Sequence, residues 1–184
     1  MRVISGIYKG RQLASFKAEH IRPTTDRVKE TLFNIIGSEI SSARVLDLFS
    51  GTGNLGIEAL SRGASYVECV EVNKRSIAII RKNLDLLKIT SQMKVVAQDV
   101  FKYLKTYKGD SFDVVLIDPP FTEKWADKSL AAISTSSVLG SQTLIVIESS
   151  RHEMLNNVYG RLSLLDRRDF GDKSASFFRV INSD

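Results

Sequence analysis

The fold is decided by one stretch of the chain, which reads Val45-Leu46-Asp47-Leu48-Phe49-Ser50-Gly51-Thr52-Gly53-Asn54-Leu55-Gly56. Its first five residues are apolar apart from one acid, and such a run predicts a buried strand. The three glycines fit the spacing G-x-G-x-x-G between that strand and a helix that continues to about Arg62. Because glycine allows a positive φ and a close approach of the backbone, this turn is a candidate ligand-binding loop.

The same alternation of strand and helix continues along the chain. Further strands are expected at 66–71, 94–97, 112–117 and 143–148, and helices at 73–87, 100–107 and 124–134. Strands with nearly continuous apolar sequence, alternating with helices, are typical of a parallel sheet covered on both faces. Two more strand-like runs, near 161–169 and 175–181, are joined by a short loop, as in a hairpin. The sequence therefore predicts an α/β fold with a doubly wound, mostly parallel sheet and an antiparallel edge.

The composition is that of a single soluble domain. The chain has 184 residues, of which 43% are hydrophobic and 26% charged, close to the averages for globular proteins. No run approaches the roughly 20 apolar residues that cross a bilayer, and the N-terminus does not resemble a signal peptide. The single cysteine, Cys69, excludes an intramolecular disulfide and a multi-cysteine metal site. We therefore expect a cytoplasmic monomer with no membrane segment and no metal.

Positive charge is concentrated at the N-terminus. The net charge is +5, and residues 1–22 hold five basic residues against one acid, Glu19. A basic end on a nearly neutral body suggests a polyanionic partner that is bound through its phosphates. We expect residues 1–22 to form a basic β-ribbon extension and residues 23–184 to form the main domain. The other basic run, Lys74-Arg75 with Arg81-Lys82, is expected to be a solvated helix face.

A helix is expected to follow the segment Arg22-Pro23-Thr24-Thr25-Asp26. Pro23 favours an extended residue before it, and the threonines or the aspartate would cap the helix. The apolar stripe expected to face the core consists of Val28, Leu32, Ile35 and Ile36.

Acidic residues accompany the predicted strands. Glu71 ends the second strand, 20 residues beyond Gly51, where an acid suits the two hydroxyls of a ribose. These features indicate an adenosine-containing ligand, either a dinucleotide or S-adenosylmethionine. Asp47 lies close to where a dinucleotide pyrophosphate would lie, so its charge favours the cationic S-adenosylmethionine. Asp99, after the third strand, suits either the adenine amino group or the cap of the next helix.

The tetrapeptide Asp118-Pro119-Pro120-Phe121 ends the fourth strand and carries the most chemical information. An exocyclic amino group on a base is a poor nucleophile because its lone pair is delocalised into the ring. The Asp118 carboxylate and the Pro119 carbonyl would accept hydrogen bonds from the two N–H groups of this amino group. The nitrogen lone pair would then turn toward a methyl donor. Consecutive prolines restrict the backbone that carries these oxygens, and Phe121 would stack on the base. We predict that all four residues, Asp118, Pro119, Pro120 and Phe121, are catalytic.

Taken together, the motifs are similar to those of a known family. The chain resembles the bacterial 16S rRNA (guanine-N2)-methyltransferases of the RsmD type along essentially its whole length. The resemblance rests on the opening residues 1–6 with Lys9-Gly10-Arg11, on residues 22–34, on residues 47–60, on Asp118-Pro119-Pro120-Phe121 and on Gly171-Asp172.

The resemblance implies a class I, Rossmann-like methyltransferase with a seven-stranded sheet. Its implied activity is transfer of a methyl group from S-adenosylmethionine to N2 of a guanine in 16S rRNA, within a small-subunit particle or assembly intermediate, with S-adenosylhomocysteine as product. The expected cofactor-binding residues are Asp47, Ser50, Gly51, Gly53, Glu71, Val72, Asp99 and Val100. The expected nucleic-acid-binding residues are Arg2, Lys9, Arg11, Arg22, Thr24 and Thr25. No role beyond packing is expected for Trp125.

Other functions fit part of the pattern. A DNA amino-methyltransferase, acting on adenine N6 or cytosine N4, would use the same tetrapeptide, but this chain is short for a separate target-recognition region. Methylation of a protein glutamine is chemically open, although the basic N-terminus argues against it. An NAD-dependent oxidoreductase explains the glycine turn and Glu71 and leaves Asp47 and Asp118 unexplained. A non-catalytic RNA-binding module explains the charge and leaves the acids unexplained.

Overall fold

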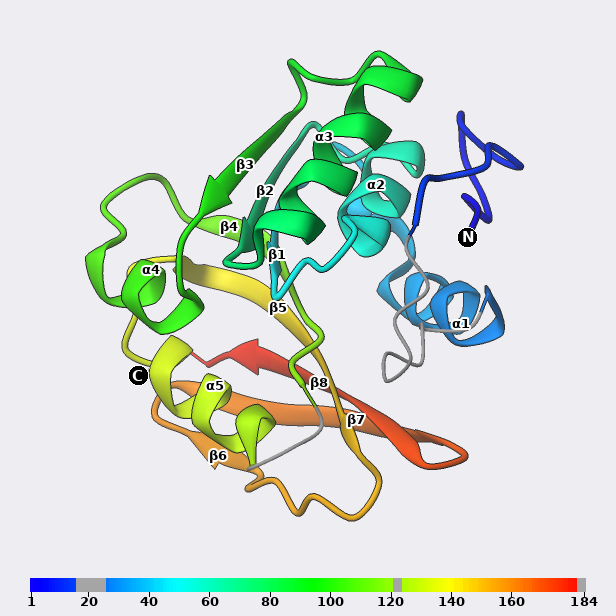
Figure 1. The fold of residues 1–184 in the computed structure, drawn as a ribbon. Helices are drawn as coiled ribbons and strands as arrows, with labels where there is room; N and C mark the ends of the chain where they lie inside the picture. The colour runs from blue at the N-terminus through cyan, green and yellow to red at the C-terminus, as the bar shows by residue number, and fades with distance from the viewer. Residues whose placement is uncertain (16–25, 121–123, 182–184) are drawn as a thin grey trace.

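The computed structural model describes residues 1–15, 26–120 and 124–181. The strands in this part of the chain are β1 (Arg44–Leu48), β2 (Tyr66–Glu71), β3 (Met93–Ala97), β4 (Phe112–Ile117), β5 (Leu139–Ser150), β6 (Val158–Tyr159), β7 (Leu162–Phe170) and β8 (Lys173–Val180). They form one sheet in the order β3-β2-β1-β4-β5-β8-β7-β6 (Figure 1). Strands β1 to β5 pair in parallel, and β8, β7 and β6 continue the sheet antiparallel. The predicted fold class is confirmed, and the two-residue β6 adds an eighth strand to the seven implied.

Helices cover both faces of this sheet. Their bounds are α1 (Asp26–Ile36), a 3-10 turn η1 (Gly37–Ile40), α2 (Asn54–Ser61), α3 (Lys74–Leu87), α4 (Val100–Thr106) and α5 (Trp125–Ile133). Helices α1, α2 and α3 share one apolar core with Val45, and α4 and α5 share a second with Leu46. Successive residues of a strand point to opposite faces, so the single strand β1 supplies both cores. None of the helices in the described ranges is long and apolar enough to span a membrane.

The inward face of α1 differs from the expected stripe. Leu32 and Ile36 are buried as expected, but Ile35 is 39% exposed, and Lys29 and Phe33 are buried instead. The reason is an ion pair: Lys29 Nζ lies 3.1 Å from the wholly buried Glu58 carboxylate of α2. That pair rotates the helix so that positions 29, 32, 33 and 36, which have helical spacing, face the core.

The N-terminal segment folds back on α2. Within residues 1–15, Arg2 and Gln12 form an isolated antiparallel β-bridge, and the amides of Val3 and Leu13 donate to the carbonyls of Arg11 and Met1 at 3.0 and 2.9 Å. Residues 16–22 of the expected ribbon lie outside the described residues. The amides of Ile4 and Ser5 donate to Glu58 at 2.8 and 3.0 Å, and Val3 is buried in the core that α1 and α2 share. The segment is therefore a compact turn held by the body of the protein (Figure 1).

Strand register brings the loops of interest to one edge of the sheet. Leu48 of β1 pairs with Val70 of β2 and with Ile117 of β4. The next residues along the three strands are Phe49, Glu71 and Asp118, so these start their loops at the same level. This carboxyl edge of the parallel strands is where ligands bind in open α/β sheets.

Candidate active site

The glycine turn after β1 has the backbone that the sequence predicts. Gly51 has φ +54° and Gly53 has φ +77°, a region that favours glycine. A Cβ on Gly53 would press on Ile80 of α3 at 3.2 Å, whereas a Cβ on Gly51 would meet no atom closer than 4.0 Å. Gly53 is therefore needed for packing, and Gly51 faces open space from which a ligand can approach the backbone.

Glu71 ties this turn to the end of β2. Its Oε2 accepts a hydrogen bond from the Gly51 amide at 2.8 Å. Its Oε1 accepts from the amides of Val72 and Asn73 at 2.9 and 2.7 Å. A carboxylate has about four acceptor positions, so three are used here and about one remains for a ligand hydroxyl. A second ligand hydroxyl would have to replace a backbone donor.

Asp47 lies behind the turn and is 1% exposed. Its Oδ2 accepts from the Gly56 amide at 3.0 Å and from the Cys69 thiol at 3.7 Å. Burial raises the pKa of Asp47 to about 7, although the Gly56 hydrogen bond opposes the shift. The carboxylate thus holds the first turn of α2 from inside the fold, and its predicted role toward a cationic ligand stays a prediction. Cys69 is buried in β2, as its type suggests.

Asp99 and its neighbours occupy the end of β3. The Asp99 side chain caps α4 by accepting from the Lys102 amide at 2.9 Å, which is the second of the two roles considered for it. Val100 is buried in the core, whereas Val72 is 66% exposed. An apolar side chain left exposed beside Glu71 offers a contact for the flat ring of a ligand. Ser50 is buried and donates to the Asp47 carbonyl at 2.6 Å, which shapes the turn from within.

The loop after β4 begins at the same level. The Asp118 amide lies 3.4 Å from the Leu48 carbonyl of β1, and the Asp118 side chain is half-buried. Pro119 is buried and Pro120 is exposed. Four residues with predicted roles lie outside the described residues, so those roles stay predictions: Phe121, Arg22, Thr24 and Thr25.

A cluster of aromatic rings borders these loops and was not foreseen. Phe49 and Phe101 each contact Trp125, with ring centroids 5.8 and 5.4 Å apart, and Lys128 Nζ lies 5.9 Å from the Trp125 ring centroid. All three rings are half-buried. The expectation that Trp125 packs is correct, but its packing partners come directly from the site loops. The signal in the sequence was that Phe49 and Phe101 immediately follow site segments.

The basic N-terminal residues differ in how they are paired. Arg2 forms an exposed ion pair with Asp26 at 2.9 Å, while Lys9 and Arg11 are exposed.

Among the residues described, no group of three or more His, Cys, Asp or Glu side chains is placed to hold a metal ion.

A doubly wound sheet with a glycine turn after β1, an acid at the end of β2 and Asp-Pro-Pro after β4 has the architecture of the class I methyltransferases. The chain belongs to the family described as "Conserved hypothetical protein 95", the RsmD-type methyltransferases, whose family model matches residues 1–179.

Several relatives are similar over most of their length. The chain is 39% identical to the Ribosomal RNA small subunit methyltransferase D of Haemophilus influenzae over 157 residues, covering 84% of this chain and 81% of the relative. It is 35% identical to the Putative rRNA methyltransferase YlbH of Bacillus subtilis over 181 residues, covering 97% and 98% of the two chains. The solved structure of the putative methyltransferase yhhF from Escherichia coli is 32% identical, with a TM-score of 0.87 and 98% coverage of both chains.

Proposed function

We propose that this protein transfers a methyl group from S-adenosylmethionine to the exocyclic N2 amino group of a guanine in 16S rRNA. The observation that carries the proposal is the start of the Asp118-Pro119-Pro120 loop at the same level as Glu71 and the glycine turn. The methyl donor, bound at Glu71 and the glycine turn, would meet the target amino group at this edge. Asp118 and Pro119 would hold that amino group and are called the amino-group clamp. The substrate class follows from the names of the relatives, which refer to ribosomal RNA of the small subunit.

The residues at the edge fit S-adenosylmethionine. Gly51 leaves its backbone open to a ligand, Glu71 keeps acceptor capacity for a ribose hydroxyl, and Val72 exposes apolar surface for an adenine ring. The bound cofactor would supply an already activated methyl group, so these residues need only bind and orient it. The adenine amino group of the cofactor would approach Asp99. Because Asp99 Oδ1 already caps α4, it would have to accept from the Lys102 amide and from the adenine amino group together.

The target base would be positioned by the loop after β4. The Asp118 carboxylate and the Pro119 carbonyl would accept hydrogen bonds from the two N–H groups of the amino group. These two hydrogen bonds would hold the nitrogen lone pair toward the methyl donor. The carboxylate also stabilises the positive charge that develops on the nitrogen. Phe121 would stack on the guanine, and the half-buried rings of Phe49 and Trp125 would exclude water from the same edge.

The basic N-terminal segment would contact the phosphates of the rRNA. Lys9 and Arg11 are exposed, and Arg2 is paired with Asp26 at the exposed surface. The charges of these three residues therefore remain accessible. In this proposal the rRNA is presented in a small-subunit particle or an assembly intermediate, and the protein acts in the cytoplasm as a monomer. Arg22, Thr24 and Thr25 would extend the contact toward the target base.

The test is transfer of a labelled methyl group from S-adenosylmethionine to three substrates side by side: unmethylated small ribosomal subunits, protein-free 16S rRNA and duplex DNA. We expect label in the rRNA of one of the first two, and the better substrate identifies the assembly stage. Label in DNA alone would retain the clamp chemistry and overturn the rRNA proposal. Transfer to none of the three, despite measurable cofactor binding, would reject all the nucleic-acid substrates considered.

A further inference from the structure

The outer face of α3 carries a cluster of cations. Lys74, Arg75, Arg81 and Lys82 are all exposed on this face, against one acid, Asp85. The opposite side of the helix, which includes Ile77, Ile80, Leu84 and Leu87, is buried as the sequence predicted. Seven residues separate the two cation pairs, which is about 10 Å along a helix. The cations therefore form one stripe rather than a scatter.

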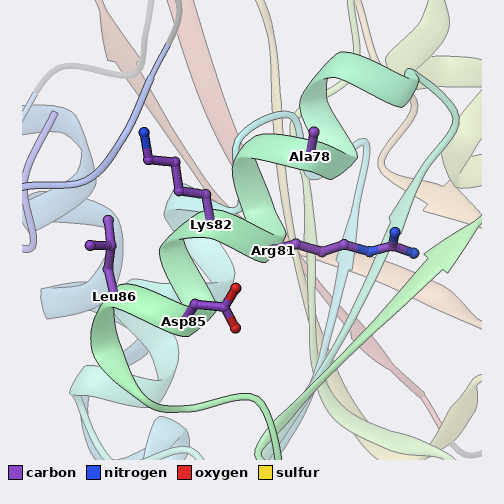
Figure 2. Close-up of a pocket in the computed structure, with 5 residues that line it drawn as sticks. All are labelled: Ala78, Arg81, Lys82, Asp85 and Leu86. Carbon is purple, nitrogen blue, oxygen red and sulfur yellow. The ribbon is translucent and has the colours of Figure 1, made fainter.

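A shallow hollow lies over the C-terminal half of α3, around the second cation pair. Its volume is about 570 Å³, and it is lined by Ala78, Arg81, Lys82, Asp85 and Leu86. Figure 2 shows Arg81 and Lys82 extending in opposite directions from the helix, with the short Ala78 side chain one turn earlier. Leu86 is 56% exposed. The hollow thus offers two divergent cations around an open floor with an apolar side, a shape suited to a phosphate–sugar backbone.

None of the four cations forms an ion pair with another described residue. This distinguishes them from Lys29 and Arg62, which are both paired with Glu58. Asp85 is the single acid of α3 against four exposed cations, so the face keeps a net positive charge that is available for an anionic partner.

The N-terminal segment is anchored on the buried side of the same helix. Asn83 of α3 binds the Ala14 backbone twice: its Oδ1 accepts from the Ala14 amide at 2.7 Å, and its Nδ2 donates to the Ala14 carbonyl at 3.2 Å. Asn83 is wholly buried, so this junction is part of the fold. The basic N-terminal segment and α3 are thereby held side by side. The other end of α3 begins two residues after Val72, at the proposed cofactor edge.

We infer that the outer face of α3, centred on Arg81 and Lys82, is a docking surface for the phosphate backbone of RNA. This inference rests on the proposed function and adds a second contact surface, in place of the solvated helix face that the sequence suggested. The α3 surface would bind substrate RNA at a distance from the target base and act together with the N-terminal segment. Its contribution is to affinity and its salt dependence, since phosphate contacts carry no base specificity.

The test compares three variants with the wild type in binding to protein-free 16S rRNA at a series of KCl concentrations. In Arg81→Gln/Lys82→Gln two phosphate contacts are lost, so we expect binding about tenfold weaker near 0.1 M salt and a log–log salt slope smaller by about 1.4 to 1.8. In Asp85→Asn the one acid is removed, so binding should tighten by about two- to threefold. The matched control is Lys105→Gln/Lys108→Gln, which removes two exposed charges at and just after α4 on the other face of the sheet.

A salt slope in Arg81→Gln/Lys82→Gln equal to that of the wild type, or an equal loss in the control, would overturn the inference. If the double variant does not fold, unchanged binding by Asp85→Asn would do the same. Because non-specific RNA binding needs no methylation, this assay separates the two proposals. A wild type that binds rRNA through α3 but labels no rRNA would reject the proposed substrate and retain the docking surface.

Discussion

Two sets of buried or half-buried carboxylates in this protein are satisfied in different ways. Glu58 is wholly buried and is paired with Lys29 at 3.1 Å and with Arg62 at 2.9 Å, besides two backbone amides. Asp47 and Glu71 accept hydrogen bonds from backbone amides and a thiol, and neither forms an ion pair within the described part of the chain. Cationic side chains are paired with the first carboxylate, whereas the other two are held by hydrogen-bond donors that carry no charge.

Glu58 is thus a structural acid, whereas Glu71 is a candidate for ligand binding. Glu58 joins the N-terminal segment, α1 and α2 at one point, because Lys29 also donates to the Arg2 carbonyl at 2.8 Å and to Asn54 at 2.7 Å. Burial lowers the pKa of Lys29 and the Glu58 carboxylate opposes that shift, so the charge of Lys29 depends on Glu58. Glu71 lies at the edge at which the proposed cofactor would add its own donors, and the buried Asp47 lies behind the glycine turn. Changes at Glu58 should thus affect stability, and changes at Glu71 should affect binding.

The largest effect is expected for Glu58→Ala. It leaves the Lys29 ammonium buried without its carboxylate, and breaking a buried ion pair in this way costs about 3–5 kcal/mol of unfolding free energy. Denaturant titration measures the loss, and Glu30→Ala, an exposed acid on α1, should change it by less than about 0.5 kcal/mol. Equal stability of the two variants would remove the distinction drawn between the carboxylates.

A smaller effect, on binding, is expected for Glu71→Ala. Loss of a hydrogen bond to a charged acceptor should weaken S-adenosylmethionine binding by about 10- to 100-fold, or about 1.4–2.7 kcal/mol. Calorimetric titration gives the dissociation constant, and the folded state should persist because no buried charge is left alone. A dissociation constant equal to that of the wild type would exclude Glu71 from the ribose site.

Asp47→Asn sharpens the comparison through pH. The pKa of Asp47 is raised by burial from 3.8 to about 7 in the folded state, so the folded protein binds a proton that the unfolded chain has released. Wild-type stability should therefore fall as the pH rises from about 4 to about 7, at up to about 1.4 kcal/mol per pH unit relative to Asp47→Asn, and level off above that range. Unfolding free energies of both proteins across this range test the sign; a difference that does not vary with pH would show that Asp47 has an ordinary pKa.

Much of the fold could be predicted because it depends on local patterns. The alternation of apolar strands and helices and the glycine spacing identify the doubly wound sheet, and the apolar face of α3 is buried as its periodicity indicates. The rotation of α1 could not be predicted, because a lysine is buried there only when a distant acid, Glu58, neutralises it. The strand β6 has two residues, too few for a pattern.

The site was predictable in outline and less so in detail. Strand-end motifs identify Glu71 and Asp118, and the register of β1, β2 and β4 brings them to one level. Whether Asp99 caps a helix depends on its side-chain rotamer, and the sequence leaves that open. The positions of Phe49 and Phe101 beside site segments were visible in the sequence, but their contact with Trp125 joins three separate segments and depends on tertiary packing.

The most direct test of the central claim is nucleoside mass spectrometry of unmethylated small subunits after incubation with S-adenosylmethionine and either the wild type or Asp118→Ala. With the wild type we expect N2-methylguanosine in the 16S rRNA. With Asp118→Ala we expect turnover lower by at least about a hundredfold, with cofactor affinity within about twofold of the wild type because the proposal places Asp118 against the base and not the cofactor. Methylation of another base or atom, or wild-type turnover by Asp118→Ala, would contradict the proposed amino-group clamp.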